Sequence, residues 1–259
     1  MNRKNKFKIV VLLLLATISV SFIISKSKSK PTLFLIGDST VRNGTLGNGG
    51  GGLWGWGSFL NERIDTFKIS IQNRAMGGTS SHSYTATGLW DKVLKDIKPG
   101  DFVIMQFGHN DNGKSAVSGT GDDTIHVINP RSKKEEIVHS FGWNMRKYIL
   151  ETKAKGATPI ICSLVPRNRW KDNRVIRDQT HAIWAKTVAD EEGVLFIDLN
   201  TIIANHYDQL GQDQVMGKYF TEKDAVHTIK EGAVESSILV AEGLRMLKRN
   251  PLKKYMLPY

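Results

Sequence analysis

Five short strand-like stretches, separated by segments with helical character, constrain the fold of this chain more than any other feature of its sequence. The first, at residues 33–36, is an unbroken apolar run, which is typical of a strand buried on both faces of a parallel sheet. The others lie at 68–73, 101–107, 158–164 and 194–198. Strands that alternate with helices in this way predict an α/β fold, with helices on both faces of one doubly wound parallel sheet.

The segments between these stretches predict the remaining elements. We expect helices at residues 58–64, 81–97, 134–155, 178–192 and 230–247, and another that begins near residue 199. Residues 112–133 are polar and contain glycine, which predicts a long surface loop. The length of 259 residues suits one large domain, which we place at residues 31–247, followed by a basic, peripheral tail at residues 248–259.

Residues 1–30 have the composition of a targeting segment. They include seven Lys or Arg residues and no acidic residue, and residues 9–25 carry no charge. A positive start followed by an apolar stretch is typical of a secretory signal peptide. Because no clear cleavage site precedes residue 26, an uncleaved membrane anchor through residues 9–25 is the alternative. Both predict an exported protein, periplasmic or extracellular, and sequencing the mature N-terminus would distinguish them.

The net charge of +11 does not by itself indicate a nucleic-acid-binding protein. Beyond residue 30 the chain has 29 basic and 25 acidic residues, a net charge of +4, which is an ordinary surface balance. Neither zinc-finger spacing nor a basic run interleaved with aromatic residues is present. The single cysteine, Cys162, lies in an apolar run, so we expect it in the core and expect no disulfide.

The sequence Gly37-Asp38-Ser39-Thr40 follows the first apolar run directly. Gly37 permits a sharp turn, which places Ser39 at the carboxyl edge of the sheet, where open α/β sheets bind their ligands. A serine at this place is a candidate nucleophile. Alternatively, Asp38, Ser39 and Thr40 only cap the segment that follows.

Three further segments are expected at the same edge of the sheet. Gly78 and Asn110 follow the second and third strand-like stretches, and Asp224 and His227 precede the last helix. Their spacing lets the Asp224 carboxylate hold one nitrogen of the His227 ring while the other faces a serine. Together they supply a base, an orienting acid and donors for an oxyanion. Alternatively, Gly78 is a turn glycine and Asn110 and His227 are caps, and His109 is the main rival for the base.

Several motifs together carry a resemblance to a known family: Gly37-Asp38-Ser39-Thr40, Gly55-Trp56-Gly57, residues 73–81, residues 106–111, Asp224-Ala225-Val226-His227 and Gly232-Ala233. From about residue 31 to residue 247 the chain resembles the SGNH (GDSL-type) hydrolases, and within them the rhamnogalacturonan acetylesterase group. The resemblance implies a three-layer αβα fold of the flavodoxin-like type. It also implies a catalytic triad of Ser39, His227 and Asp224, with oxyanion donors at Ser39, Gly78 and Asn110.

The resemblance implies a serine esterase that hydrolyses acetyl esters on a polysaccharide, in the first place pectic rhamnogalacturonan. We expect no metal or organic cofactor, an acetylated polysaccharide or oligosaccharide as the partner, no nucleic acid, and a monomer. Two departures from the group's pattern leave the polymer open: His82 stands where Arg is common, and Val226 stands where Thr is usual. The alternatives are an SGNH esterase or lipase for another ester (peptidoglycan acetyl, thioester or lipid) and a catalytically vestigial carbohydrate-binding protein.

Overall fold

A computed structural model describes residues 30–42, 49–113, 115–129 and 133–258. Pro31–Tyr259 forms one compact unit, to which every element below belongs. The expected signal peptide or membrane anchor lies outside the described residues, except for Lys30. Among the helices of the described part, none combines the length and the apolar content that a membrane crossing requires.

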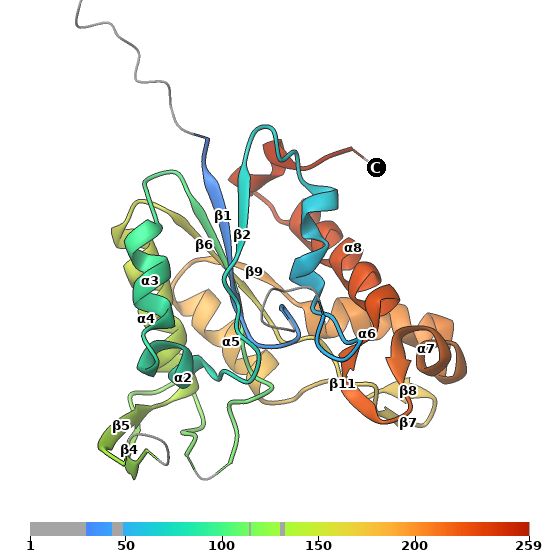
Figure 1. The fold of residues 1–259 in the computed structure, drawn as a ribbon, viewed down its shortest axis with the longest axis horizontal. Coiled ribbons are helices and arrows are strands. Elements are labelled where there is room, and N and C mark those ends of the chain that lie inside the picture. The colour runs from blue at the N-terminus through green and yellow to red at the C-terminus, as the bar shows by residue number, and fades with distance from the viewer. Residues whose placement is uncertain (1–29, 43–48, 114, 130–132, 259) are drawn as a thin grey trace, which may run out of the picture. The chain divides into compact units, whose positions relative to one another are not determined.

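The five predicted strand regions form one parallel sheet, which confirms the α/β fold (Figure 1). The strand order β2-β1-β3-β6-β9 corresponds to the order 2-1-3-4-5 of flavodoxin-like sheets. The direction of winding therefore reverses between β1 and β3, which is the usual place for a ligand site in such sheets. The strands are β1 (Thr32–Gly37), β2 (Ser70–Asn73), β3 (Phe102–Gln106), β6 (Thr158–Cys162) and β9 (Leu195–Ile197).

Each face of the sheet has its own apolar core, because successive residues of a strand point to opposite faces. From β1, Leu33 and Leu35 lie in one core, and Phe34 and Ile36 lie in the other. All four side chains are buried, which explains the unbroken apolar run. Cys162, at the end of β6, is buried in the first core, as the sequence predicts.

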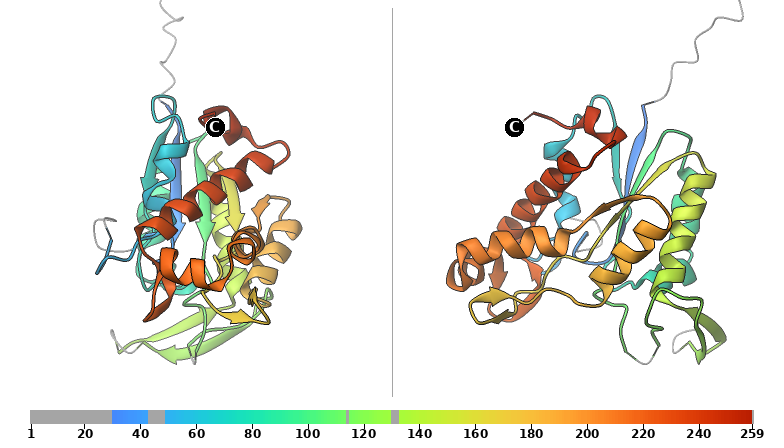
Figure 2. Two further views of the ribbon diagram at one scale, coloured as in Figure 1. Left: turned by 90° about the vertical axis from the view of Figure 1, so that its right-hand side faces the viewer. Right: turned by 180° about the vertical axis from the view of Figure 1, so that it is seen from behind.

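Helices cover both faces and complete a three-layer arrangement (Figures 1 and 2). The core with Phe34 and Ile36 packs against α2–α5, and the core with Leu33 and Leu35 packs against α6–α8 and the 3₁₀ turns η1–η3. The helices are α2 (Ser81–Ala86), α3 (Leu89–Asp96), α4 (Phe141–Ala154), α5 (His181–Glu191), α6 (Leu199–Leu210), α7 (Gln212–Tyr219) and α8 (Lys230–Met246). The 3₁₀ turns are η1 (Trp56–Ser58), η2 (Leu60–Arg63) and η3 (Pro251–Tyr255).

An antiparallel hairpin replaces part of the loop expected at residues 112–133 and the start of the helix expected at residues 134–155. Strand β4 (Thr124–Ile128) pairs with β5 (Glu135–His139), and helix α4 begins only at Phe141. The Ser140 side chain caps α4 by accepting a hydrogen bond from Trp143 N at 3.1 Å. The charged residues before Ser140 suit a helix, but their pairing with β4 decides their conformation.

Two other predicted helices differ in form. The helix expected at residues 81–97 is divided into α2 and α3 at Gly88, whose φ of 71° is left-handed and interrupts the helical backbone. The helix expected at residues 58–64 is replaced by the turns η1 and η2. Two small hairpins lie in the connections: β7 (Trp170–Lys171) with β8 (Arg174–Val175), and β10 (Phe220–Thr221) with β11 (Asp224–Thr228).

The C-terminal residues pack against the domain, which corrects the prediction of a peripheral tail. Leu252 is completely buried and belongs to the core on the α8 side. The backbone oxygen of Tyr255 accepts a hydrogen bond from Asp65 N at 2.7 Å, and Met256 forms a β-bridge with Ile64. The apolar side chains within this otherwise basic segment are the sequence signal for its packing.

Candidate active site

Ser39 lies just beyond the carboxyl end of β1, at the edge where the winding of the sheet reverses. Gly37 ends the strand with a φ of 154°, and a Cβ atom at this position would lie 2.4 Å from the backbone oxygen of Gln106. Only glycine therefore fits where the chain leaves β1. The close approach of β3 and this turn leaves Ser39 only 9% exposed.

A chain of buried hydrogen bonds fixes the turn that carries Ser39. Asp38 Oδ1 accepts from Thr40 N at 2.9 Å and from Thr40 Oγ1 at 2.7 Å. Thr40 Oγ1 accepts from Gln106 Nε2 at 2.6 Å, and Gln106 Oε1 accepts from Trp56 Nε1 at 2.8 Å. Because these side chains are buried, water does not compete for the hydrogen bonds, and the backbone at Ser39 is held rigidly. Sequence reasoning offers Thr40 only as a cap and does not predict this chain of hydrogen bonds through Thr40, Gln106 and Trp56, although all three lie in motifs that carry the family resemblance.

The structure brings the three predicted triad residues into one hydrogen-bonded chain. Ser39 Oγ lies 2.8 Å from His227 Nε2, and His227 Nδ1 lies 2.8 Å from Asp224 Oδ2. Because an ionised carboxylate only accepts hydrogen bonds, Nδ1 carries the proton and Nε2 accepts from the Ser39 hydroxyl. Partial burial raises the pKa of Asp224, but the hydrogen bonds from His227 and Val226 outweigh it and lower that pKa below its usual value. The carboxylate is therefore ionised and can stabilise an imidazolium.

The segment that carries Asp224 and His227 is a short strand, β11. It is anchored on two sides by backbone hydrogen bonds. Trp54 N donates to Thr228 O at 2.8 Å, and Asn168 N donates to Ala225 O at 2.7 Å. These contacts connect β11 to the loop before η1 and to the loop after β6, so the strand that carries His227 is held from both directions.

The predicted oxyanion donors lie close to the serine and to each other. A Cβ atom added at Gly77 would lie 3.5 Å from Ser39 Cβ, so the turn that contains Gly78 passes close to the serine. Asn110 Nδ2 donates to Thr79 O at 3.0 Å, which connects the end of β3 to this turn. Within the described residues, the N–H groups of Ser39 and Gly78 have no hydrogen-bond acceptor. They are therefore available to an oxyanion.

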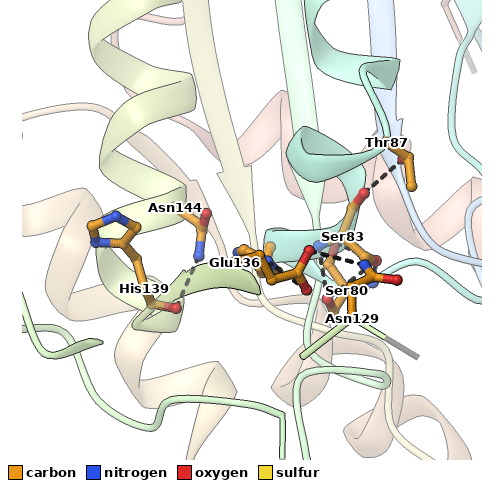
Figure 3. A network of polar contacts seen from close by, with 8 residues as sticks. Ser80, Ser83, Thr87, Asn129, Glu136, His139 and Asn144 are labelled. Atoms are coloured by element: carbon orange, nitrogen blue, oxygen red, sulfur yellow. Dashed lines mark hydrogen bonds and ion pairs between the residues drawn. The ribbon is translucent and has the colours of Figure 1, made fainter. Parts of the chain in front are cut away.

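Helix α2, which follows the glycine turn, is fixed by a capping box and by the β4–β5 hairpin. Ser80 Oγ accepts from Ser83 N at 3.0 Å, and Ser83 Oγ accepts from Ser80 N at 2.8 Å. Figure 3 shows these serines near the hairpin residues Asn129 and Glu136, which hydrogen-bond to each other at 2.9 Å. Glu136 Oε1 also lies 3.7 Å from Nε2 of His82 in α2. The hairpin thus supports the helix that positions the glycine turn.

A comparison with known protein families identifies the family of this chain. The sequence profile of the GDSL-like Lipase/Acylhydrolase family matches residues 35–232, which include the serine, both predicted oxyanion segments and the triad histidine. The chain belongs to the GDSL-like lipase/acylhydrolase family. The members are carboxylic ester hydrolases, and relatives of this chain are named acetylesterases, so this GDSL-like hydrolase is an enzyme of that class.

Two known proteins are similar to this GDSL-like hydrolase over most of its length. It is 30% identical over 210 residues to the rhamnogalacturonan acetylesterase of Emericella nidulans, with 78% of this chain and 80% of that protein covered. It is also 30% identical over 220 residues to the probable rhamnogalacturonan acetylesterase YesY of Bacillus subtilis, with 83% and 93% covered.

Solved structures agree with the family fold. The crystal structure of YxiM from Bacillus subtilis matches with a TM-score of 0.68 at 27% identity, covering 84% of this chain and 56% of that one. The GDSL-like hydrolase thus spans little more than half of YxiM. A variant of the acetyl xylan esterase Axe2 from Geobacillus stearothermophilus matches with a TM-score of 0.51 at 16% identity, covering 88% and 97%, which shows the shared fold alone.

His109, the rival for the base, occupies a different environment in this GDSL-like hydrolase. Its side chain is 5% exposed, and within the described residues neither ring nitrogen has a hydrogen-bond partner. Burial lowers the pKa of His109, and the Asp38 carboxylate partly opposes this effect. The Ser39 hydroxyl meets the ring of His227. The geometry therefore favours His227 as the base and a neutral, buried His109.

Because His109 is buried, we predict that the free energy of unfolding of this GDSL-like hydrolase falls in mild acid. Its folded pKa lies below the unfolded value of about 6.5, so between these two values the unfolded chain binds a proton that the folded chain does not. Lowering the pH through this window therefore favours unfolding, by up to about 1.4 kcal/mol per pH unit for one such group. Urea unfolding of the wild type and of His109→Gln at several pH values should show a shallower decline for the variant. Equal pH dependence of the two would contradict this prediction.

Proposed function

We propose that this GDSL-like hydrolase removes acetyl groups from a polysaccharide, with pectic rhamnogalacturonan as its preferred polymer. The observation that carries the proposal is the hydrogen-bonded chain from Ser39 Oγ through His227 to Asp224, beside free N–H groups. Two relatives named as rhamnogalacturonan acetylesterases support this choice of polymer. The export expected from residues 1–30 would bring the enzyme to such polymers.

In the first half of the proposed reaction, Ser39 Oγ attacks the acetyl carbonyl carbon while His227 Nε2 takes the hydroxyl proton. The resulting oxyanion receives hydrogen bonds from Ser39 N, Gly78 N and Asn110 Nδ2. Asp224 stabilises the imidazolium that forms. His227 then gives the proton to the sugar oxygen as the carbon–oxygen bond breaks, which leaves an acetyl group on Ser39 and a free sugar hydroxyl.

In the second half, water attacks the acetyl-serine carbonyl, and His227 takes a proton from that water. The same three N–H groups bind the second oxyanion. When the bond to Ser39 Oγ breaks, the proton returns to the serine and acetate leaves. In both halves His227 carries the proton and Asp224 stabilises the imidazolium.

A small cavity borders residues that adjoin Ser39 and His227 in the sequence. A cavity lined by Thr40, Trp54 and Val226, among others, has a volume of about 10 Å³. That is about the space that one water molecule requires. An acyl chain of several carbons does not fit in this cavity.

We therefore expect kcat/KM on nitrophenyl esters not to rise from acetate through butyrate to octanoate. An apolar groove would contribute about 0.8 kcal/mol for each buried CH₂, or about fourfold in rate. Initial rates on the three esters at one pH measure the trend. A steady increase with chain length would overturn the acetylesterase proposal in favour of a lipase.

The polymer is tested by measuring acetate release from acetylated rhamnogalacturonan, acetylxylan and acetylated peptidoglycan. We expect the highest kcat/KM on rhamnogalacturonan, and a higher value on either of the others would reject that polymer. Labelling with a fluorophosphonate, with Ser39→Ala as the control, tests the alternative of a vestigial carbohydrate-binding protein. A folded wild type that is not labelled would support that alternative.

A further inference from the structure

A second cavity, of about 330 Å³, borders the loop that follows β6. Its apolar lining includes Leu164, Val165 and Ile176, and its polar rim includes Arg167 and Arg169. None of these residues belongs to the proposed triad or to the oxyanion donors. The volume falls at the lower end of the range for small-molecule sites, which is enough for a small polar ligand.

The charge of the rim arginines is the second feature of this cavity. Within the part of the chain that the structure describes, neither Arg167 nor Arg169 forms an ion pair with a carboxylate. Arg177, a third arginine at the cavity, is different because its Nη2 lies 2.6 Å from Asp208 Oδ2. Asp178, the acidic residue on the rim, accepts hydrogen bonds through Oδ1 from the backbone N–H groups of Thr180 and Ala182 at the start of α5.

The loop that carries the two arginines is held in place. Arg169 N donates to Arg167 O at 2.8 Å, and Ile176 N donates to Arg169 O at 2.8 Å. Trp170 Nε1 donates to Asn168 Oδ1 at 2.7 Å. A backbone fixed in this way loses little conformational freedom when a ligand binds to its side chains.

The same loop contacts both segments that supply the proposed chemistry. Arg167 Nη2 lies 3.4 Å from the backbone oxygen of His109, which precedes the oxyanion donor Asn110. Asn168 N bonds to Ala225 O at 2.7 Å, inside the segment of the triad acid and base. These contacts attach the loop that carries the rim to the residues beside the proposed site.

We propose that Arg167 and Arg169 bind the carboxylate of a uronic acid in the polymer, next to the sugar that carries the acetyl group. Guanidinium groups bind carboxylates through paired, charge-assisted hydrogen bonds, and a neutral polymer would leave these arginines without a counter-ion. This inference rests on the proposed function. It makes the enzyme selective for acidic polysaccharides over neutral ones such as xylan.

The test compares an acetylated uronic-acid polymer with free carboxylates and the same polymer with methyl-esterified carboxylates, which have lost the charge and gained a methyl group. We expect the wild type to prefer the free-acid polymer. In Arg169→Gln the ratio of kcat/KM on the free-acid polymer to that on the esterified polymer should fall about 10-fold, as for loss of a hydrogen bond between charged groups. Arg167→Gln should act in the same direction. The matched control is Lys171→Gln, which removes one positive charge from an exposed position nearby and should keep the wild-type ratio.

The outcomes separate this inference from the proposed function. Equal kcat/KM of the wild type on both polymers, or an unchanged ratio in Arg169→Gln, would overturn the carboxylate site while leaving the acetylesterase proposal intact. An equal fall of the ratio in Lys171→Gln would also overturn it, because general surface charge would then explain the preference. Hydrolysis of nitrophenyl acetate without acetate release from either polymer would reject both proposals.

Discussion

Replacing Ser39 or His227 by alanine should each abolish nearly all esterase turnover, with kcat lowered by about 10⁴-fold or more. The two side chains meet at 2.8 Å and act as one unit, so either loss removes the activated nucleophile. The double variant should therefore be little worse than either single one, because the remaining rate comes from the oxyanion donors and from binding. Initial rates on nitrophenyl acetate give kcat for all three variants, and circular dichroism checks that each is folded.

His109→Gln is the control for this assignment. It removes the rival histidine, which is buried and whose ring nitrogens have no hydrogen-bond partner among the described residues, so most of kcat should remain. A folded His227→Ala variant with nearly normal kcat, together with an inactive His109→Gln variant, would contradict the triad. The proton acceptor would then have to be His109.

The parallel sheet could be predicted because its signals are local. The apolar run in β1 is continuous because the strand is buried on both faces, and Gly37 marks its end. The parallel arrangement then places the ends of β1, β2 and β3 at one edge. This geometry explains why Ser39, Gly78 and Asn110, far apart in the sequence, could be expected to lie together in space.

The hairpin before α4 could not be predicted in the same way. Glu135 and Glu136 are good helix formers, and only their pairing with Thr124–Ile128 makes them a strand. The alternation of polar and apolar residues from Thr124 to Val127 is the sequence signal for that partner strand. Side-chain networks are harder to predict from sequence than strands. The hydrogen bonds from Trp56 through Gln106 to Thr40 join a loop to a strand that no local pattern relates. The same is true of the cavity rim that contains Arg167 and Arg169.

Asn110→Ala should lower kcat by about 10²–10³-fold and change KM little, because the amide is proposed to bind charge that exists only in the transition state. Ser39 N and Gly78 N remain in this variant, so the loss should be clearly smaller than that of the triad variants. Asn110 Nδ2 also donates a hydrogen bond to Thr79 O, so the substitution also removes a contact that holds the glycine turn. A crystal structure of the variant would show whether that turn has moved.

Asn112→Ala is the matched control, since it removes the same side chain two residues further along the same loop. Its Nδ2 donates to His109 O at 2.9 Å, and the residue is exposed, so this variant should keep most of kcat. If Asn110→Ala raises KM and leaves kcat unchanged, Asn110 binds the substrate and its transition state equally well. Oxyanion binding would then rest on the two backbone N–H groups alone, and the turn at Gly78 would become the decisive element of the site.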